Sequence, residues 1–484
     1  MNSLDIFFEK LNEDNIHYAV FKSVDSLSLS FSGDEDIDLV VDPAQISNVL
    51  SIIERMEGIV CCLHKSLTTK HRYDILLPDF QNSKFYHIDL HEKIPIGLKF
   101  NKFNFYKDLK ECQIVFNKAY GVFCFTRYEE LCLLICKIAF RKNLFFKKKI
   151  IIKSTDTMYS EISNCINELN LKTSSLHVFG KPLTIKFLDN KFQFESKDLK
   201  AIRKVFHFTP LYANYYKRIF RHYGRKVTYK LHRYLSKWAP NRIFDRRAPQ
   251  TGGKLIALIG VDGSGKSSHV KKLYNTLSWK LSVNTAYLGS GDGPGWYFRR
   301  ALTKFLIKQK RSNVAKNLLK NQENQKSLKR DIVYIIIGIH ALILACERFS
   351  KVKKIQKAIQ NNIVIISDRW PHNYSGGVLD GPVNVFASQR NIITQLLSRL
   401  EQYAYDKINM TDLKIGFIFL ETSFEDTMKR KPGELSLEDY NRRVDVIKKI
   451  KGNTEHVFNI KTTPSMELVE KDVFEATWKI LNDL

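Results

Sequence analysis

One short stretch of the sequence has the residue types and the spacing of a phosphate-binding loop. Residues 255–260 are almost wholly apolar, which predicts a buried parallel strand. Residues 260–267 then read Gly-Val-Asp-Gly-Ser-Gly-Lys-Ser, and a helix is predicted from His269. Glycines permit a tight turn whose backbone N–H groups point at one anion, and the helix N-terminus adds partial positive charge. The stretch therefore indicates a site for a nucleoside triphosphate with Mg²⁺.

The side chains of this stretch have separate expected roles. Lys266 is expected to reach the β- and γ-phosphates, and the Ser267 hydroxyl is expected to ligate Mg²⁺. A simple glycine turn on the surface would not need this lysine and serine in register, so we favour the phosphate site. The residues expected to bind the nucleotide are Gly260, Gly263, Ser264, Gly265, Lys266, Ser267 and Ser268.

A second buried strand, predicted over residues 362–367, ends in Asp368-Arg369-Trp370-Pro371. An aspartate at the carboxyl tip of a strand beside the phosphate loop can hold Mg²⁺ through water. The planar fork of N–H groups on Arg369 suits a second phosphate group. A purely structural ion pair is the alternative for these two residues.

A third buried strand is predicted over residues 413–420, and two helices rich in basic residues follow it. Ser423 and Ser436 are the expected N-caps of these helices, because an acidic residue stands three positions after each. Arginines between residues 429 and 443, with Arg430 among them, would form a lid that stabilises charge on the transferred group. A solvated basic face is the alternative.

Three carboxylates stand out in the N-terminal part of the chain. Asp36 and Asp38 are two residues apart on a predicted strand, so their side chains share one face, and Asp89 lies on a later strand. Clustered carboxylates repel one another unless a divalent cation binds, so we expect these three to hold Mg²⁺. A solvated acidic strand entry is the alternative. Strands are predicted at residues 17–22, 37–41, 58–63, 72–77 and 85–90, and helices at 5–11 and 46–56.

Bulk properties limit the class of protein. The chain has 484 residues, 44% of them hydrophobic, which is enough for two or three domains with sizeable cores. Its net charge of +27 indicates an anionic partner. The eight cysteines include no C-x-x-C pair, which fits a reducing cytoplasm, and the N-terminus does not resemble a signal peptide. The longest apolar run, residues 332–346, is short for a membrane span and predicts a buried core helix.

The composition divides the chain into four parts. We predict an α/β domain at 1–125, a helical basic region at 126–238, a linker at 239–253, and a doubly wound parallel sheet at 254–484. Residues 200–247 contain 14 lysines and arginines but one acid, interleaved with aromatic residues. This stretch suits an anionic membrane surface, less so nucleic acid, and a solvated linker is the alternative. The predicted location is the cytoplasm, with peripheral contact at the inner face of the membrane if the stretch binds lipid.

The C-terminal part resembles the thymidylate kinase family of P-loop kinases at residues 260–268, 368–370 and 429–443. The resemblance implies a phosphotransferase that uses ATP and Mg²⁺. It also implies that Asp262 touches the sugar of the acceptor, that Arg369 holds its phosphate, and that Arg430 supplies the catalytic arginine. The segment that seats thymidylate in that family is missing, and a glycine-rich stretch at 289–295 replaces it. The implied acceptor is therefore a nucleoside monophosphate or a sugar or glycan, with no commitment to thymidylate.

The N-terminal part resembles an uncharacterised bacterial branch of the nucleotidyltransferase fold. The carrying residues are Asp-Ile-Asp-Leu-Val-Val at 36–41 and His-Ile-Asp-Leu-His at 87–91. In this resemblance Asp36 and Asp38 hold metal and Asp89 completes the site, although Lys22-Ser23 replaces the usual Gly-Ser turn. Two other functions stay open beside the kinase: a nucleotidyltransferase, and a nucleotide-gated protein that binds a membrane or nucleic acid.

Overall fold

The computed structural model describes residues 2–22, 27–63, 71–98, 101–141, 149–153, 155, 157–169, 174–188, 191–205, 220, 222–228, 230–231, 234, 247–289, 328–374, 378–383, 392–411, 413–452, 454–463 and 465–483. The chain forms two compact units, Met1–Lys237 and Trp238–Leu484. Each has its own sheets and its own core.

The N-terminal unit contains a mixed sheet with strand order β3-β4-β5-β2-β1-β9-β8. The β2–β5 and β1–β9 pairs are parallel, and the other neighbours are antiparallel. All five strands predicted in this part of the chain are present. The strands are β1 (Tyr18–Val20), β2 (Ile37–Val41), β3 (Ile59–Leu63), β4 (Arg72–Asp79), β5 (Lys84–His91), β8 (Ile114–Asn117) and β9 (Val122–Phe125).

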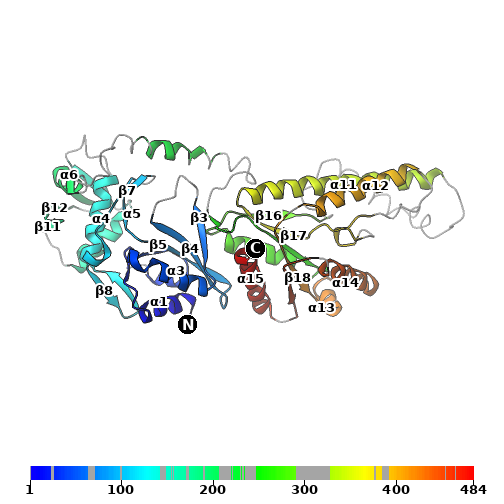
Figure 1. The fold of residues 1–484 in the computed structure, drawn as a ribbon, viewed down its shortest axis with the longest axis horizontal. Helices are drawn as coiled ribbons and strands as arrows, with labels where there is room; N and C mark the ends of the chain where they lie inside the picture. The colour runs from blue at the N-terminus through cyan, green and yellow to red at the C-terminus, as the bar shows by residue number, and fades with distance from the viewer. Residues whose placement is uncertain are drawn as a thin grey trace. The chain divides into compact units, whose positions relative to one another are not determined.

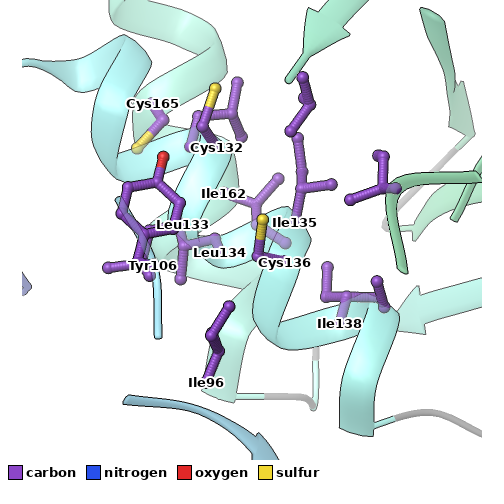
Figure 2. Packing of buried hydrophobic residues seen from close by; sticks show 14 of the residues in the cluster. Ile96, Tyr106, Cys132, Leu133, Leu134, Ile135, Cys136, Ile138, Ile162 and Cys165 are labelled. Atoms are coloured by element: carbon purple, nitrogen blue, oxygen red, sulfur yellow. The ribbon is translucent and has the colours of Figure 1, made fainter. Parts of the chain in front are cut away.

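Helices cover this sheet on both faces, as the alternation of side chains along β2 requires. Leu39 and Val41 pack with the apolar residues of α1 (Ser3–Glu13) and α3 (Ile46–Arg55). Val40 belongs to a second core that includes α4 (Arg127–Arg141), whose side chains gather with Tyr106 and Ile96 in Figure 2. Thr126 accepts a hydrogen bond at the start of α4, because the backbone N–H of Glu129 donates to Thr126 Oγ1 at 3.3 Å.

The prediction of a helical region at 126–238 was only partly correct, because α4 and two further helices lie there together with a sheet. An antiparallel sheet with the order β10-β13-β12-β11 lies within this region, beside two short helices. Residues 149–153 alternate between exposed lysine or isoleucine and buried isoleucine, which is the period of a strand. The elements are β10 (Lys149–Lys153), β11 (Ser174–Val178), β12 (Lys181–Leu188), β13 (Lys191–Glu195), α5 (Thr157–Glu168) and α6 (Ser196–Val205).

The C-terminal unit contains a parallel sheet with the order β16-β17-β15-β18-β19. Every residue of the central strand β15 is buried, as its apolar sequence predicts. The strands are β15 (Leu255–Gly260), β16 (Val283–Tyr287), β17 (Val364–Asp368), β18 (Ile415–Glu421) and β19 (Val457–Lys461). The helices are α8 (Lys266–Leu277), α11 (Leu328–Gln360), α12 (Ile392–Asn409), α13 (Phe424–Arg430), α14 (Leu437–Lys451) and α15 (Met466–Asp483).

Helix α11 runs beside α12, as Figure 1 shows. We predicted that residues 332–346 of α11 would be buried, but Ile339 is 41% exposed and its neighbours from Tyr334 to Ile337 are half-buried. The run is apolar on all sides of the helix, and only part of that surface is covered. In the described part of the chain no helix is both long and apolar enough to cross a membrane.

Shorter elements complete the described structure. They are α2 (Leu27–Ser32), β6 (Pro95–Leu98), β7 (Asn101–Phe105), β14 (Arg247–Pro249), and the 3-10 turns η2 (Pro43–Gln45), η3 (Leu109–Glu111) and η6 (Val378–Asp380).

Candidate phosphate-binding site

The loop between β15 and α8 has the backbone that its glycines predict. Gly263 and Gly265 have φ of +87° and +88°, in the left-handed region that residues with a Cβ avoid. A Cβ on Gly260 would lie 2.5 Å from Ser264 Oγ and 2.7 Å from the Leu420 carbonyl oxygen. Gly265 is also the N-cap residue of α8, so the free N–H groups of this helix begin at the loop. The arrangement is a phosphate-binding cradle at the carboxyl end of a central strand.

Lys266 lies within this cradle and is only 6% exposed. Its Nζ donates to the carbonyl oxygens of Gly260 at 2.9 Å and Val261 at 2.7 Å, and lies 4.0 Å from Asp262 Oδ1. Burial, and then the positive charge of Arg369, lower the pKa of Lys266 to about 8. A bound anion at the loop would therefore stabilise the charged form of Lys266.

The lowered pKa predicts a pH dependence of nucleotide affinity. Lys266 is protonated below about pH 8, and only the protonated form attracts phosphate, so affinity should fall as the pH rises through this value. Titration with a fluorescent ATP analogue between about pH 7.5 and 10 measures the effect, because ATP itself keeps its charge there. Lys266→Ala is the control, and its weak binding should not change across the range. Equal affinity of the unchanged protein at both ends would contradict the prediction.

Ser267 and Asp368 meet as the metal-binding hypothesis requires. Strand β17 is the neighbour of β15, and Asp368 pairs in register with Leu258. Ser267 Oγ donates to Asp368 Oδ2 at 2.6 Å, whereas the buried Asp368 Oδ1 has no hydrogen-bond partner in the described structure. A carboxylate oxygen left without a donor beside a hydroxyl is a donor set that suits Mg²⁺. Ser264 is buried in the loop, whereas Ser268 is exposed on the first turn of α8.

Arginines surround Asp262 of the loop. Asp262 Oδ1 lies 2.5 Å from Arg369 Nη2, and Oδ2 pairs with Arg443 Nη1 of α14. Burial disfavours the charged form, but Arg369 and Arg443 outweigh it and hold the pKa of Asp262 below its usual value. Arg369 also reaches Asp380 Oδ2 at 3.2 Å. The edge of the sheet next to the phosphate loop is therefore lined by alternating carboxylates and guanidinium groups.

Both basic helices after β18 reach the loop. Ser423 and Ser436 are their N-caps, as predicted, and accept from the backbone N–H groups of Asp426 and Asp439. Arg430 donates to the carbonyl oxygens of Gly263 at 3.3 Å and, with its other Nη, of Thr462 at 2.7 Å. The helices thus carry two arginines, Arg430 and Arg443, to residues Gly263 and Asp262 of the loop.

Sequence reasoning did not assign roles to two further residues of this edge, Arg348 and Asp380. Arg348 of α11 is 2% exposed, and its Nη2 lies 2.6 Å from Asp380 Oδ1. Arg348 stands next to Glu347, just after the apolar run that ends at Cys346, so the sequence does not mark it as buried. Nothing local in the sequence identifies that partner, which is 32 positions away.

The N-terminal carboxylates are only partly arranged as predicted. Asp38 pairs in register with Asp89 across β2 and β5, and their oxygens lie within 4.8 Å of each other and of a His91 ring nitrogen. Asp36 lies outside this group, because it pairs with His87 Nδ1 at 3.0 Å. Burial raises the pKa of Asp89 to about 6, against the opposing effect of Arg72.

Two cations already contact the N-terminal carboxylates. Lys22 Nζ lies 2.9 Å from Asp38 Oδ2, and Arg72 Nε donates to Asp89 Oδ1 at 2.9 Å. Asp74 of β4 shares Arg72 and His87. Among the described residues, Lys22 and Arg72 contact these carboxylates and the charge of Lys137 also acts on Asp38, against the four carboxylates of Asp36, Asp38, Asp74 and Asp89.

Some predictions fall on residues outside the description. They concern the glycine-rich stretch after Gly289, most of the basic and aromatic stretch at 206–246, and Ser23 beside Lys22.

No known family model matches the sequence. Over 221 residues, the chain is 24% identical to a protein of Escherichia coli K12 described as an uncharacterized ATP-binding protein, YghR. The similarity covers 45% of this chain and 84% of that protein, and the figures are the same for its counterpart in strain CFT073.

Solved thymidylate kinases are also similar to part of the chain. The enzyme of Ehrlichia chaffeensis is 14% identical and that of Candida albicans 16%, each with a TM-score of 0.27. Both matches cover 47% of this chain, and they cover 99% and 91% of the respective structures. By its own parallel sheet and phosphate loop, the C-terminal unit is a P-loop α/β unit.

Proposed function

We propose that the protein is an ATP- and Mg²⁺-dependent phosphotransferase of the thymidylate kinase-like type. The observation that carries the proposal is the position of Lys266 and the Ser267–Asp368 pair beside the Asp262–Arg369 pair, at one end of one sheet. The first two elements suit a donor triphosphate and its metal, and the third suits an acceptor. The relative described as ATP-binding supports ATP as the donor.

Each group has a distinct part in this mechanism. The backbone N–H groups of the loop and Lys266 would hold the donor phosphates, and Ser267 and Asp368 would hold Mg²⁺, which neutralises developing charge when bound. Arg430 and Arg443 would stabilise the transferred group and exclude water. An acceptor phosphate is already ionised and needs no base. For a sugar hydroxyl, Asp262 is the carboxylate at the loop that would orient or deprotonate it.

A panel of acceptors tests the proposal. The purified chain would be incubated with Mg²⁺ and ATP labelled in the γ-phosphate, together with nucleoside monophosphates, and then with phosphorylated or lipid-linked sugars. Transfer of label to any of them supports the proposal. Labelled thymidylate would mean that other residues form a thymine pocket, whereas a labelled sugar would identify a glycan kinase. Absence of transfer and of ATP hydrolysis across the panel would overturn it.

For the N-terminal unit we propose a divalent-metal site at Asp38, Asp89 and His91. The proposal is supported by the mutual distance of their ligand atoms and by the excess of carboxylates over cations in the layer. Two carboxylates and an imidazole suit Mn²⁺ better than Mg²⁺. Nucleotidyl transfer by this site, cytoplasmic location, and contact of the basic stretch with anionic lipid stay predictions of the sequence.

Mn²⁺ binding tests this second site. In a chain that carries Asp368→Asn to silence the phosphate site, Mn²⁺ titration followed by electron paramagnetic resonance should show one bound ion. Asp89→Asn should weaken its binding by roughly 10- to 100-fold, because one charged ligand is lost. Asp36→Asn is the matched control, since Asp36 pairs with His87, and it should have little effect. Equal Mn²⁺ affinity in all three chains would contradict the proposal.

A further inference from the structure

Asp380 is a buried carboxylate between two arginines. Its side chain is 1% exposed, with Arg348 Nη2 at 2.6 Å from one oxygen and Arg369 Nη1 at 3.2 Å from the other. Its backbone carbonyl oxygen also accepts from Arg348 Nη1 and from Tyr405 Oη, each at 3.1 Å. Such a residue is costly to bury unless its partners are fixed, so the four groups form one rigid unit.

The contacts of Asp380 connect separate elements at the carboxyl end of the sheet. Arg348 comes from α11, Tyr405 from α12, and Arg369 directly follows β17. Arg348 Nε also donates to the Leu288 carbonyl oxygen after β16, at 3.0 Å. The turn that carries Asp380 therefore ties the helical layer to the strand end from which Arg369 projects.

The backbone is strained at the same place. Arg369, Leu379 and Asp380 have φ of +74°, +49° and +75°, a region that residues other than glycine rarely adopt. Strain of this kind persists only where the surroundings enforce it, and it is frequent at functional sites. Here it turns the carboxylate of Asp380 and the guanidinium of Arg369 toward each other.

Arg369 has a second carboxylate partner, Asp262, but that contact is of a different kind. Asp262 is 27% exposed in its side chain, and it also binds Arg443 of the lid. When a lid moves or a phosphate arrives, the partners of Asp262 change. Asp380 is buried, and its carboxylate pairs with Arg348 and Arg369, while the turn that carries it also packs against α14. Although burial disfavours the charged form, Asp380 and Asp262 together raise the pKa of Arg369, so the guanidinium stays charged.

We infer that Asp380 is a positioning residue that holds Arg369 at the acceptor edge. The inference rests on the proposed phosphotransferase function, because it concerns the arginine that faces the acceptor. It assigns to Asp380 no contact with a substrate. It also gives Arg348 a role, which is to fix Asp380 itself.

Asp380→Asn tests the inference, because this variant should lose phosphoryl transfer but keep its affinity for MgATP. The affinity for MgATP should stay within about twofold, since Lys266 and Asp368 are untouched, whereas phosphoryl transfer should fall by about 100-fold through misplacement of Arg369. The transfer assay uses the acceptor that the panel of monophosphates and sugars identifies. If the chain only hydrolyses ATP, water is the acceptor. The matched control is Asp406→Asn on α12. The Asp406 carboxylate accepts from the side-chain amides of Asn373 and Gln402, and its replacement should leave transfer unchanged.

A double-mutant cycle separates positioning from general stability. If Asp380 acts through Arg369, Asp380→Asn should cost little further in a chain that already carries Arg369→Ala. Additive losses in the two variants would overturn the inference. Should Asp380→Asn fail to fold because Arg348 is left unpaired, the variant Arg348→Met/Asp380→Asn removes both buried charges together and is used in the same cycle.

A chemical readout keeps this inference distinguishable from the proposed function. Phenylglyoxal modification of Arg369, followed by peptide mapping, should be several-fold faster in Asp380→Asn than in the unchanged chain, and unchanged in Asp406→Asn. If the unchanged chain shows no more turnover than Lys266→Ala, the proposed function fails, and the modification rate alone decides whether Asp380 holds Arg369. An unaltered rate at Arg369 would overturn the inference in either case.

Discussion

Replacing Lys266 by alanine is expected to abolish phosphoryl transfer while the C-terminal unit stays folded. The ammonium group lies inside the phosphate loop, held by the carbonyl oxygens of Gly260 and Val261, and it is the cation closest to where the donor phosphates would bind. Loss of one such preorganised charge costs on the order of 10²- to 10³-fold in rate, and more when substrate binding is also lost. The measurement is the transfer of labelled γ-phosphate from ATP.

The same variant should not lose stability, which separates a chemical from a structural role. The pKa of Lys266 is lowered to about 8, so the fold disfavours the charged lysine relative to the unfolded chain. Its removal should leave the thermal unfolding midpoint at or above that of the unchanged chain at neutral pH. Lys272→Ala is the control on the same helix, since Lys272 is 55% exposed and pairs with Glu470. Full turnover by Lys266→Ala would refute the proposed function.

Asp368→Asn is expected to remove the advantage of MgATP over free ATP. Asparagine keeps the shape and an oxygen for the Ser267 hydroxyl, but it lacks the negative charge that a bound divalent cation requires. Transfer should fall by about 10²- to 10³-fold, because metal stabilisation of transition-state charge contributes several kcal/mol. Nucleotide affinity measured with Mg²⁺ and with EDTA checks the result.

A surface aspartate supplies the comparison for this variant. Asp445→Asn on α14 removes a carboxylate that is 70% exposed and should leave both affinities as they are. If Asp368→Asn still binds MgATP more tightly than free ATP, then Asp368 does not hold the metal.

The parts of the site that lie close together in the chain were predictable, because they follow from local rules. Gly263, Gly265 and Lys266 are fixed by the backbone that a strand, a turn and a helix require in sequence. The position of Asp368 could also be predicted, because neighbouring parallel strands have their carboxyl ends at the same edge of the sheet. The partner of Asp262 in α14, Arg443, was predicted only as one of several basic residues, because its approach depends on how two helices pack.

Other features depend on contacts that no local pattern encodes. The common face of Asp36 and Asp38 follows from strand geometry, but the pairing of Asp36 with His87 follows from the register of β2 against β5. The region around Lys149 was described from its basic and aromatic composition. Its sequence, Lys-Ile-Ile-Ile-Lys, has no polar–apolar alternation, and the strand period appears only in the burial of these residues.

The buried Arg348–Asp380 pair also has a consequence for how this chain can change over evolutionary time. Loss of Asp380 alone leaves the buried Arg348 without its carboxylate, and loss of Arg348 alone leaves Asp380 with Arg369 as its guanidinium partner, whereas loss of both, with apolar residues in their place, restores a tolerable core. A chain with one of the two substitutions is therefore expected to be less stable than a chain with the intact ion pair or with two apolar residues. The effect of a substitution at either position thus depends on the residue at the other. Lineages that descend from this protein should keep the pair or replace it as a unit, and the strained turn at Asp380 should relax where the pair is gone.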